Sequence, residues 1–236
     1  MRDGEVDDPH LATGELDMRY LAFLPLFALL GGCNSASSTN AATIPSDGTL
    51  KDNYSSTGPA PSEEPKFEKP KDGDEVAVIT TKFGKIAFKF RSDLAPKHVE
   101  NFKTLANKGF YDKTLFHRVM PDFMIQGGDP NTKDPAKVET YGGGGPGYTL
   151  KDEFNSLDHK RGVVSMANTG QPNSGGSQFF ICVSDHADLN HKYSAFGEVV
   201  LGMDVADKIV GQPRNKKDLP NERIEMTVKI AKWPVK

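Results

Sequence analysis

The chain has 236 residues, of which 36% are hydrophobic and 26% are charged, a composition typical of a globular protein. The formal net charge is −3 at pH 7, and six acidic residues fall within positions 1–17. The remainder is therefore close to neutral, which predicts no basic face and argues against nucleic acid as a partner.

An uninterrupted apolar run, LAFLPLFALL, occupies positions 21–30. It is too short to span a membrane as a helix, which takes about twenty residues. Arg19 precedes the run and LGGC follows at 30–33, an order of charge, apolar core and small residues that is typical of a secretory signal. A buried helix ending at Gly31 is the alternative, and Pro25 in mid-run argues against it.

The sequence LGGC resembles a bacterial lipobox. This resemblance implies that Cys33 carries a lipid, becomes the mature N-terminus and anchors the protein to a membrane. We therefore predict a signal peptide region with a lipobox over residues 1–33. Acidic residues are unusual ahead of a signal peptide, so we expect translation to start at Met18 and residues 1–17 to be a mis-assigned extension.

Residues 34–73 are rich in Ser, Thr, Ala, Pro, Glu and Lys, and they offer little to bury. This composition predicts a disordered linker. Strand-like sequence begins directly afterwards, so we expect one folded domain over residues 74–236.

The first expected elements of the domain are strands over 75–80 and 85–90, joined by a turn at Gly84. A helix is expected to begin at Pro96 and to end at Gly109, a natural C-cap, because apolar residues between them recur at helical spacing. Further elements are expected in the rest of the chain: short strands around Phe116, Met124, Val163 and Phe180 and over 196–200, a short helix over 203–210, and an alternating strand over 224–230.

Many short strands with two helices indicate a mainly β fold. A closed antiparallel β-barrel is favoured because closure removes exposed sheet edges. The pattern alone also allows a sandwich.

The most informative sequence is FHRVMPDFMIQGGDP at 116–130, followed by SMAN at 165–168 and GGSQFFIC at 175–182. Together these segments resemble the cyclophilin family of peptidyl-prolyl cis/trans isomerases, over a stretch from about Glu75 to about Trp233. The resemblance implies a closed eight-stranded antiparallel β-barrel capped by two α-helices. It also implies that proline-containing polypeptides are the substrates.

Prolyl isomerisation makes and breaks no bond to carbon, so it needs no nucleophile, metal or cofactor, and we expect none. A twisted X-Pro amide regains a lone pair on nitrogen, which a fixed and permanently charged donor stabilises. Arg118 matches the family's catalytic arginine, and Gln126 matches the residue that positions it. A surface ion pair is the alternative role for Arg118.

By the same resemblance, the remaining site positions bind substrate. Aromatic and apolar side chains are expected to hold the proline ring, and amides the substrate backbone; ordinary barrel core is the alternative for the apolar ones. The substrate-binding residues are Phe123, Met124, Ala167, Asn168, Gln178, Phe180, Leu189 and Tyr193.

The chain departs from the best-known eukaryotic members at two positions and in one segment. Asp188 replaces a tryptophan, which makes cyclosporin sensitivity doubtful, and Tyr193 replaces a histidine but remains an aromatic wall with a polar tip. An insertion occupies residues 130–141.

Other signals are weaker. Glycines at 142–147 formally match a nucleotide-binding pattern, but neither strand nor helix flanks them as required, so a flexible loop is expected. His186 and His191 are more typical of solvated side chains than of a metal site. His117 is expected to be a packed structural histidine, and Cys182 a buried, inert thiol.

We therefore predict a lipid-anchored, monomeric bacterial cyclophilin in the cell envelope, on the periplasmic or extracytoplasmic face, that isomerises X-Pro bonds of folding or exported proteins. A chaperone or scaffold module that grips proline loops with incidental turnover is the alternative. A hydrolase that uses Ser177 and His186 is a third hypothesis, although no nucleophile-elbow motif is present.

Overall fold

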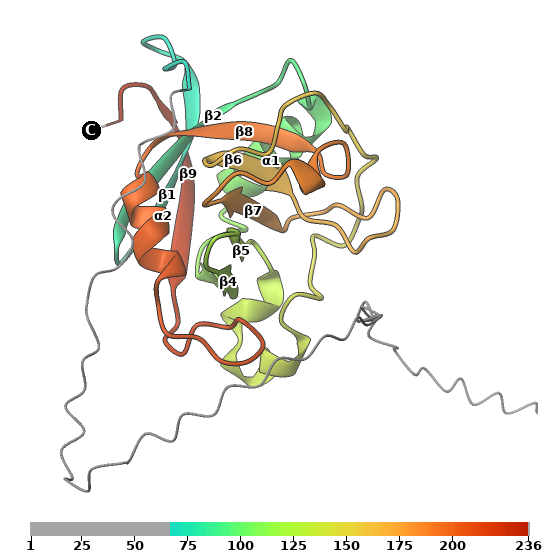
Figure 1. The fold of residues 1–236 in the computed structure, drawn as a ribbon, viewed down its shortest axis with the longest axis vertical. Coiled ribbons are helices and arrows are strands. Elements are labelled where there is room, and N and C mark those ends of the chain that lie inside the picture. The colour runs from blue at the N-terminus through green and yellow to red at the C-terminus, as the bar shows by residue number, and fades with distance from the viewer. Residues whose placement is uncertain (1–66, 236) are drawn as a thin grey trace, which may run out of the picture. The chain divides into compact units, whose positions relative to one another are not determined.

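The computed structural model describes residues 67–235 (Figure 1). The predicted signal peptide region, Cys33 and most of the predicted linker lie outside the described residues. The end of that linker, residues 67–73, contacts the domain, because the Lys89 ammonium donates to the Glu68 carbonyl at 2.8 Å and the Gly73 amide donates to the Trp233 carbonyl at 2.8 Å.

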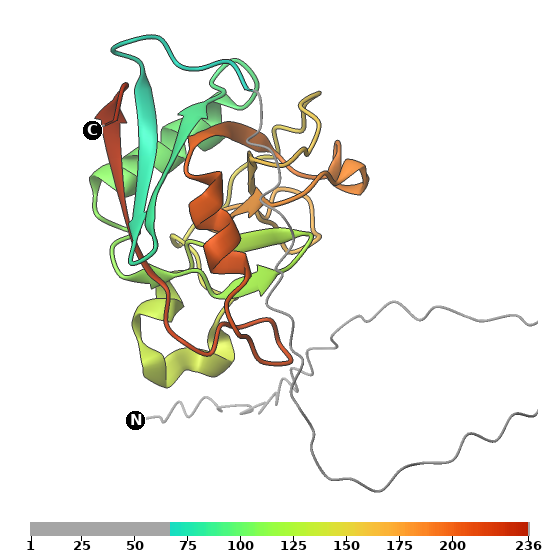
Figure 2. The ribbon, with the colours of Figure 1, turned by 60° about the vertical axis from the view of Figure 1, so that its left-hand side comes forward.

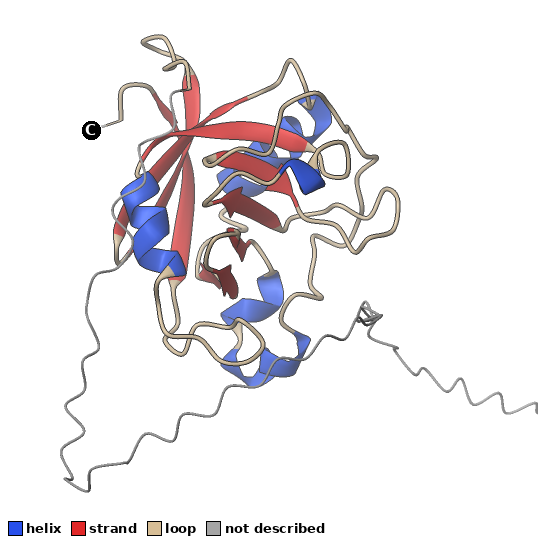
Figure 3. Ribbon diagram, in the orientation of Figure 1, coloured by secondary structure: helices blue, strands red, loops and turns tan. Residues whose placement is uncertain are grey.

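Nine antiparallel strands form one sheet, so the fold is mainly β, as expected (Figure 3). The strands are β1 (Glu75–Thr81), β2 (Gly84–Phe90), β3 (Thr114–Leu115), β4 (Arg118–Met120), β5 (Met124–Gly127), β6 (Val163–Met166), β7 (Phe179–Cys182), β8 (Ala195–Leu201) and β9 (Glu225–Lys232). Their order in the sheet is β3-β9-β1-β2-β8-β6-β7-β5-β4. The sheet therefore has nine strands where eight were expected. The single strand predicted around Phe116 is in fact two short strands, β3 and β4, separated by Phe116 and His117.

The two edge strands of this sheet, β3 and β4, are neighbours in the chain. The sheet must therefore curl until its edges approach each other. Gly127 at the end of β5 marks this approach, because a Cβ there would lie 2.5 Å from the Met226 side chain on β9 and 3.0 Å from the Leu115 carbonyl on β3. Only glycine allows so close a contact between the two ends of the sheet.

Two α-helices pack on the sheet, α1 (Pro96–Asn107) against β8 and β9, and α2 (Met203–Val210) against β2, β4 and β5 (Figure 2). Both were expected from helical spacing. Proline at the first position suits α1, since its fixed φ is helical and its missing N–H has no partner at a helix start. Gly202 precedes α2 with φ of +90°, and a Cβ there would lie 2.1 Å from the Lys85 carbonyl oxygen.

One main core joins the sheet to both helices. Phe102 of α1 is fully buried at its centre, with ring centroids of Phe88, Phe179 and Phe196 at 5.3–5.4 Å and that of Tyr111 at 4.9 Å. Aromatic pairs of this kind contribute about 0.5–1.5 kcal/mol each beyond the area they bury. The core therefore fixes α1 and β7 relative to each other.

Three 3₁₀ helices lie in the long connections: η1 (Pro130–Lys133), η2 (Pro135–Thr140) and η3 (Ala187–Leu189). The first two form the insertion, which is thus ordered. Within residues 67–235, no helix is both long and apolar enough to cross a membrane.

Candidate active site

Cross-strand register brings the predicted site residues together on β4, β5 and β7. Arg118 pairs with Gln126, which pairs with Phe180, so these three residues form one row across the sheet. Met120, Met124 and Cys182 form the row two residues further along. Because alternate residues of a strand share a face, both rows point to the same side, and the arginine stands beside an apolar surface.

The apolar surface is a cluster separate from the main core. Met124, Phe180, Cys182 and Leu189 are buried in it, and Phe123, Ala167 and Tyr193 pack against them partly exposed. The rings of Phe180 and Tyr193 meet edge to face at 5.3 Å. The cluster therefore has buried walls and an exposed aromatic rim, which suits a proline ring. Burial raises the pKa of the Cys182 thiol to about 12, which fits the expected inert role.

Two glutamines are locked beside this cluster. The Gln126 amide nitrogen donates to the Gln178 amide oxygen at 3.0 Å, and the Gln178 nitrogen donates to the carbonyls of Gly142 and Gly144 at 2.8 Å each. The loop expected to be flexible at 142–147 therefore supplies two acceptors to the site. Hydrogen bonds therefore fix the orientation of both amide groups.

Arg118 itself is only lightly restrained. Its side chain is 44% exposed, and its one charged neighbour is Asp218, 4.0 Å from its Nε. The Asp218 carboxylate is held closer to Arg214, at 3.1 Å, and its backbone carbonyl accepts from the Val119 amide at 2.9 Å. Within the described residues the guanidinium makes no hydrogen bond, so its donors are available to a ligand.

The predicted backbone-binding residues lie at the far side of the glutamines. The Ala167 amide donates to the Gln178 carbonyl at 2.9 Å. The Asn168 side chain is used within the protein, because its nitrogen donates to the Lys192 carbonyl at 3.2 Å and its oxygen accepts from the Gly170 amide at 3.0 Å. These bonds fix the loop after β6 next to Gln178.

Two residues that support the site carried no signal in the sequence. His159 lies behind Phe180 with stacked rings at 6.1 Å, and its Nε2 is 2.8 Å from the Ser165 hydroxyl. Burial lowers the pKa of His159. Asp129, fully buried, accepts from the amides of Asn131 and Gly142 and so ties the glycine loop to the insertion.

Both histidines that flank the site differ from simple solvated groups. His117 is 6% exposed, as expected for a packed residue, and burial lowers its pKa. His186, expected to be solvated, packs on Phe123 at 4.7 Å. Within residues 67–235, no three His, Cys, Asp or Glu side chains gather where they would hold a metal.

The hydrolase hypothesis finds no support in the geometry. The Ser177 hydroxyl is buried and donates to the Gly128 carbonyl at 2.8 Å, so it faces no base. His186 lies instead near Ser184, at 3.0 Å. Its Nε2 is also 2.8 Å from the Asp122 carbonyl, a pure acceptor. That nitrogen therefore carries the proton and does not accept one from serine.

Comparison with known proteins decides the family. The family model described as "Cyclophilin type peptidyl-prolyl cis-trans isomerase/CLD" matches residues 76–235. The chain belongs to the cyclophilin family of peptidyl-prolyl cis-trans isomerases. A cyclophilin is an isomerase that binds proline-containing peptides, so the apolar cluster beside Arg118 lies on an enzyme of that class.

Curated relatives and a solved structure agree with this assignment. "Peptidyl-prolyl cis-trans isomerase-like 1" of Neurospora crassa is 41% identical over 64% of this chain and 90% of the relative. A "Probable peptidyl-prolyl cis-trans isomerase" of Brucella abortus is 43% identical over 58% and 72%. The crystal structure of a Cryptosporidium parvum cyclophilin with the dipeptide Ala-Pro is similar with a TM-score of 0.60 and 32% identity, covering 66% of this cyclophilin and 98% of that chain.

Proposed function

We propose that Arg118 is the catalytic donor of this cyclophilin and that Gln126, its partner across the strand pair, positions it. The X-Pro amide resists rotation by about 18–20 kcal/mol because of resonance. At the twisted transition state the proline nitrogen is pyramidal and accepts a hydrogen bond, which it does not do in the planar amide. A donor that binds only the twisted form stabilises the transition state without stabilising the ground state, so it lowers the barrier.

The observation that carries this proposal is the exposed guanidinium of Arg118, which has no hydrogen-bond partner in the described structure and shares a cross-strand row with Phe180 of the apolar cluster. The cluster of Met124, Phe180 and Leu189, with Phe123 and Tyr193 at its rim, holds the proline ring. Gln178, Ala167 and Asn168 line the neighbouring pocket that the flanking residue enters, while the Gln178 and Asn168 side chains keep their hydrogen bonds within the protein. Burying the ring against these walls excludes water, which strengthens the electrostatic interaction between Arg118 and the amide.

Kinetics of two arginine variants test the proposal. Arg118→Ala removes one preorganised donor and is expected to cost roughly 3–4 kcal/mol, about a hundred- to a thousandfold in kcat/KM. Arg118→Lys restores the charge but not the planar fork, so we expect little recovery. The assay is cis/trans exchange of a proline tetrapeptide by residues 67–236, with circular dichroism as the control for folding.

The same variants separate the enzyme from a binding module. If Arg118→Ala keeps near-normal exchange rates, the catalytic assignment is wrong. If the wild-type domain binds proline peptides but does not accelerate exchange, the protein acts as a chaperone or scaffold.

We further propose that the protein acts as a monomer in the cell envelope, anchored by a lipid at Cys33, on folding or exported polypeptides. Support comes from the order of Arg19, the apolar run at 21–30 and the residues LGGC. One acyl chain binds a membrane only marginally, whereas two or more give stable attachment. Mass spectrometry of the native protein tests the anchor. We expect nothing upstream of Cys33 and an added acyl glyceride mass; unmodified Cys33 in the membrane fraction contradicts it.

A further inference from the structure

A cavity of about 510 Å³ opens beside Arg118, on the side of β4 next to the insertion. One wall is the end of η2, with Val138 and Glu139, and the opposite wall is the loop after α2, with Lys216 and Leu219. Figures 1 and 2 both place that loop beside the η helices. The volume is within the range of about 300–1,000 Å³ found for ligand sites, and neither wall belongs to the proline cluster.

The walls are held in place by hydrogen bonds and ion pairs. Lys217 and Glu139 join them across the cavity at 3.0 Å. Behind η2, Arg223 donates to the Tyr141 hydroxyl at 3.2 Å. Inside the loop, the Asn215 side chain accepts from the Lys217 amide at 2.8 Å. The cavity is thus formed by ordered segments before any ligand arrives.

Positively charged side chains outnumber negatively charged ones among the residues that line the cavity. Arg118, Lys216 and Lys217 line it, and Glu139 is the one acidic side chain among the lining residues, already paired with Lys217. The carboxylate of Asp218 nearby is shared by Arg214 and Arg118. Lys216 is exposed and makes no hydrogen bond or ion pair with any other residue of the described chain. Lys216 is therefore left for an anion.

The side chain of His117 lies at the floor of the cavity and is buried. Val138 and Leu219 offer apolar contact for the methylene groups of a side chain.

We propose that this cavity is a second substrate subsite, which takes a carboxylate side chain, Asp or Glu, on one flank of the substrate proline. The inference rests on the catalytic role proposed for Arg118, since a peptide held there extends into the cavity. It gives the insertion at 130–141 a function, namely to select among proline sequences.

The test compares peptides that carry one glutamate, or glutamine in its place, at each position on either side of proline. We measure kcat/KM by exchange and Kd by titration for the wild-type domain. Exposed charge pairs stabilise by up to about 1 kcal/mol, so we expect glutamate to improve both constants by about two- to fivefold, on one flank only.

Two variants change the cavity in opposite directions. Lys216→Glu removes the glutamate preference. Glu139→Gln removes the acidic lining group and frees Lys217, so it increases the preference. Lys151→Glu, an equal change of charge at an exposed residue that does not line the cavity, is the matched control and leaves the preference unchanged. The control Lys151→Glu keeps wild-type rates on the glutamine peptides.

Several results overturn the subsite. The glutamate preference could be equal on both flanks, or Lys216→Glu and Lys151→Glu could reduce it equally. Either result means that the overall charge of the protein attracts the peptide and that the cavity has no specific role. A preference for aromatic over acidic residues on that flank means an apolar pocket. If the wild-type domain does not catalyse exchange of any peptide, the isomerase assignment fails, and the Kd values still decide whether the cavity binds a carboxylate.

Discussion

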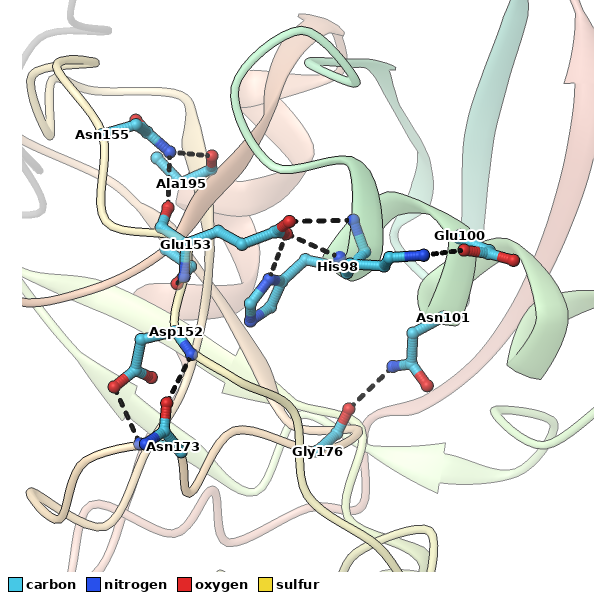
Figure 4. A network of polar contacts seen from close by, with 11 residues as sticks. His98, Glu100, Asn101, Asp152, Glu153, Asn155, Asn173, Gly176 and Ala195 are labelled. Atoms are coloured by element: carbon cyan, nitrogen blue, oxygen red, sulfur yellow. Dashed lines mark hydrogen bonds and ion pairs between the residues drawn. The ribbon is translucent and has the colours of Figure 1, made fainter.

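Glu153 supplies the missing cap of helix α1, and its removal is expected to destabilise the domain. The N-cap residue of α1, Ala95, has no side chain able to cap. The Glu153 carboxylate takes its place from a distant loop and accepts from the amides of Lys97 at 3.1 Å and His98 at 3.0 Å, and from the His98 ring at 2.7 Å (Figure 4). Loss of an N-cap costs about 0.5–2 kcal/mol.

The histidine makes the loss larger. His98 is 1% exposed, and a buried donor left without an acceptor costs about 1–3 kcal/mol. Together these effects give an expected loss of roughly 2–4 kcal/mol for Glu153→Ala. At about 2–4 °C per kcal/mol for a domain of this size, Tm falls by roughly 5–15 °C. Glu153→Gln keeps an acceptor without the charge, so we expect about half that loss.

The pH dependence provides a second measurement. Burial raises the pKa of the Glu153 carboxyl, but the hydrogen bonds from His98 and Lys97 outweigh it, and the pKa lies below its ordinary value of 4.5. A lowered pKa in the folded state means that the charged carboxylate stabilises the fold at pH above 4.5. That contribution is lost as the pH falls through the lowered pKa. The gap in Tm between wild type and Glu153→Gln should therefore be constant at neutral pH and close in acid.

The assay is thermal unfolding followed by circular dichroism from neutral pH to acid. A Tm of Glu153→Ala within experimental error of wild type would refute the capping argument. A gap between wild type and Glu153→Gln that persists unchanged in acid would refute the charge argument. Helix α1 also reaches the site, because Asn101 of this helix donates to the Gly176 carbonyl at 2.9 Å, two residues before Gln178 (Figure 4). A higher KM should accompany the lower Tm.

Three further predictions concern the rim of the site and the fold. Asp188, 70% exposed, stands where drug-sensitive relatives by resemblance carry tryptophan, so cyclosporin should bind weakly and Asp188→Trp should tighten it, as measured by inhibition of exchange. Gly128 has φ of +86° and a Cβ there would lie 2.5 Å from the Ser177 carbonyl, so Gly128→Ala should lower the free energy of unfolding by at least about 1–3 kcal/mol in urea titrations. Arg161 binds Asp207 through two hydrogen bonds of 2.8 Å, so Arg161→Ala should cost about 1.5–3 kcal/mol in the same titration, and an unchanged midpoint would contradict this.

The sequence by itself determined the elements whose signals are local. Helix α1 was expected from Pro96 onwards and α2 over 203–210, and both were confirmed, because helical spacing and a first-turn proline lie within one stretch of chain. Strands β1 and β2 were placed to within one residue for the same reason. All candidate site residues except Leu189 and Tyr193 lie in three short motifs, so the sequence named them before any contact was known.

Only the tertiary structure decided which distant residues support that site. Asp218 lies beside Arg118, the glycine loop supplies acceptors to Gln178, and Glu153 caps a helix 55 residues away. Each depends on how the curled sheet brings loops together, and a polar residue in a loop has no periodicity that marks its partner. The nine-strand order and the cavity beside the insertion have the same origin, because both are set by contacts between segments far apart in the chain.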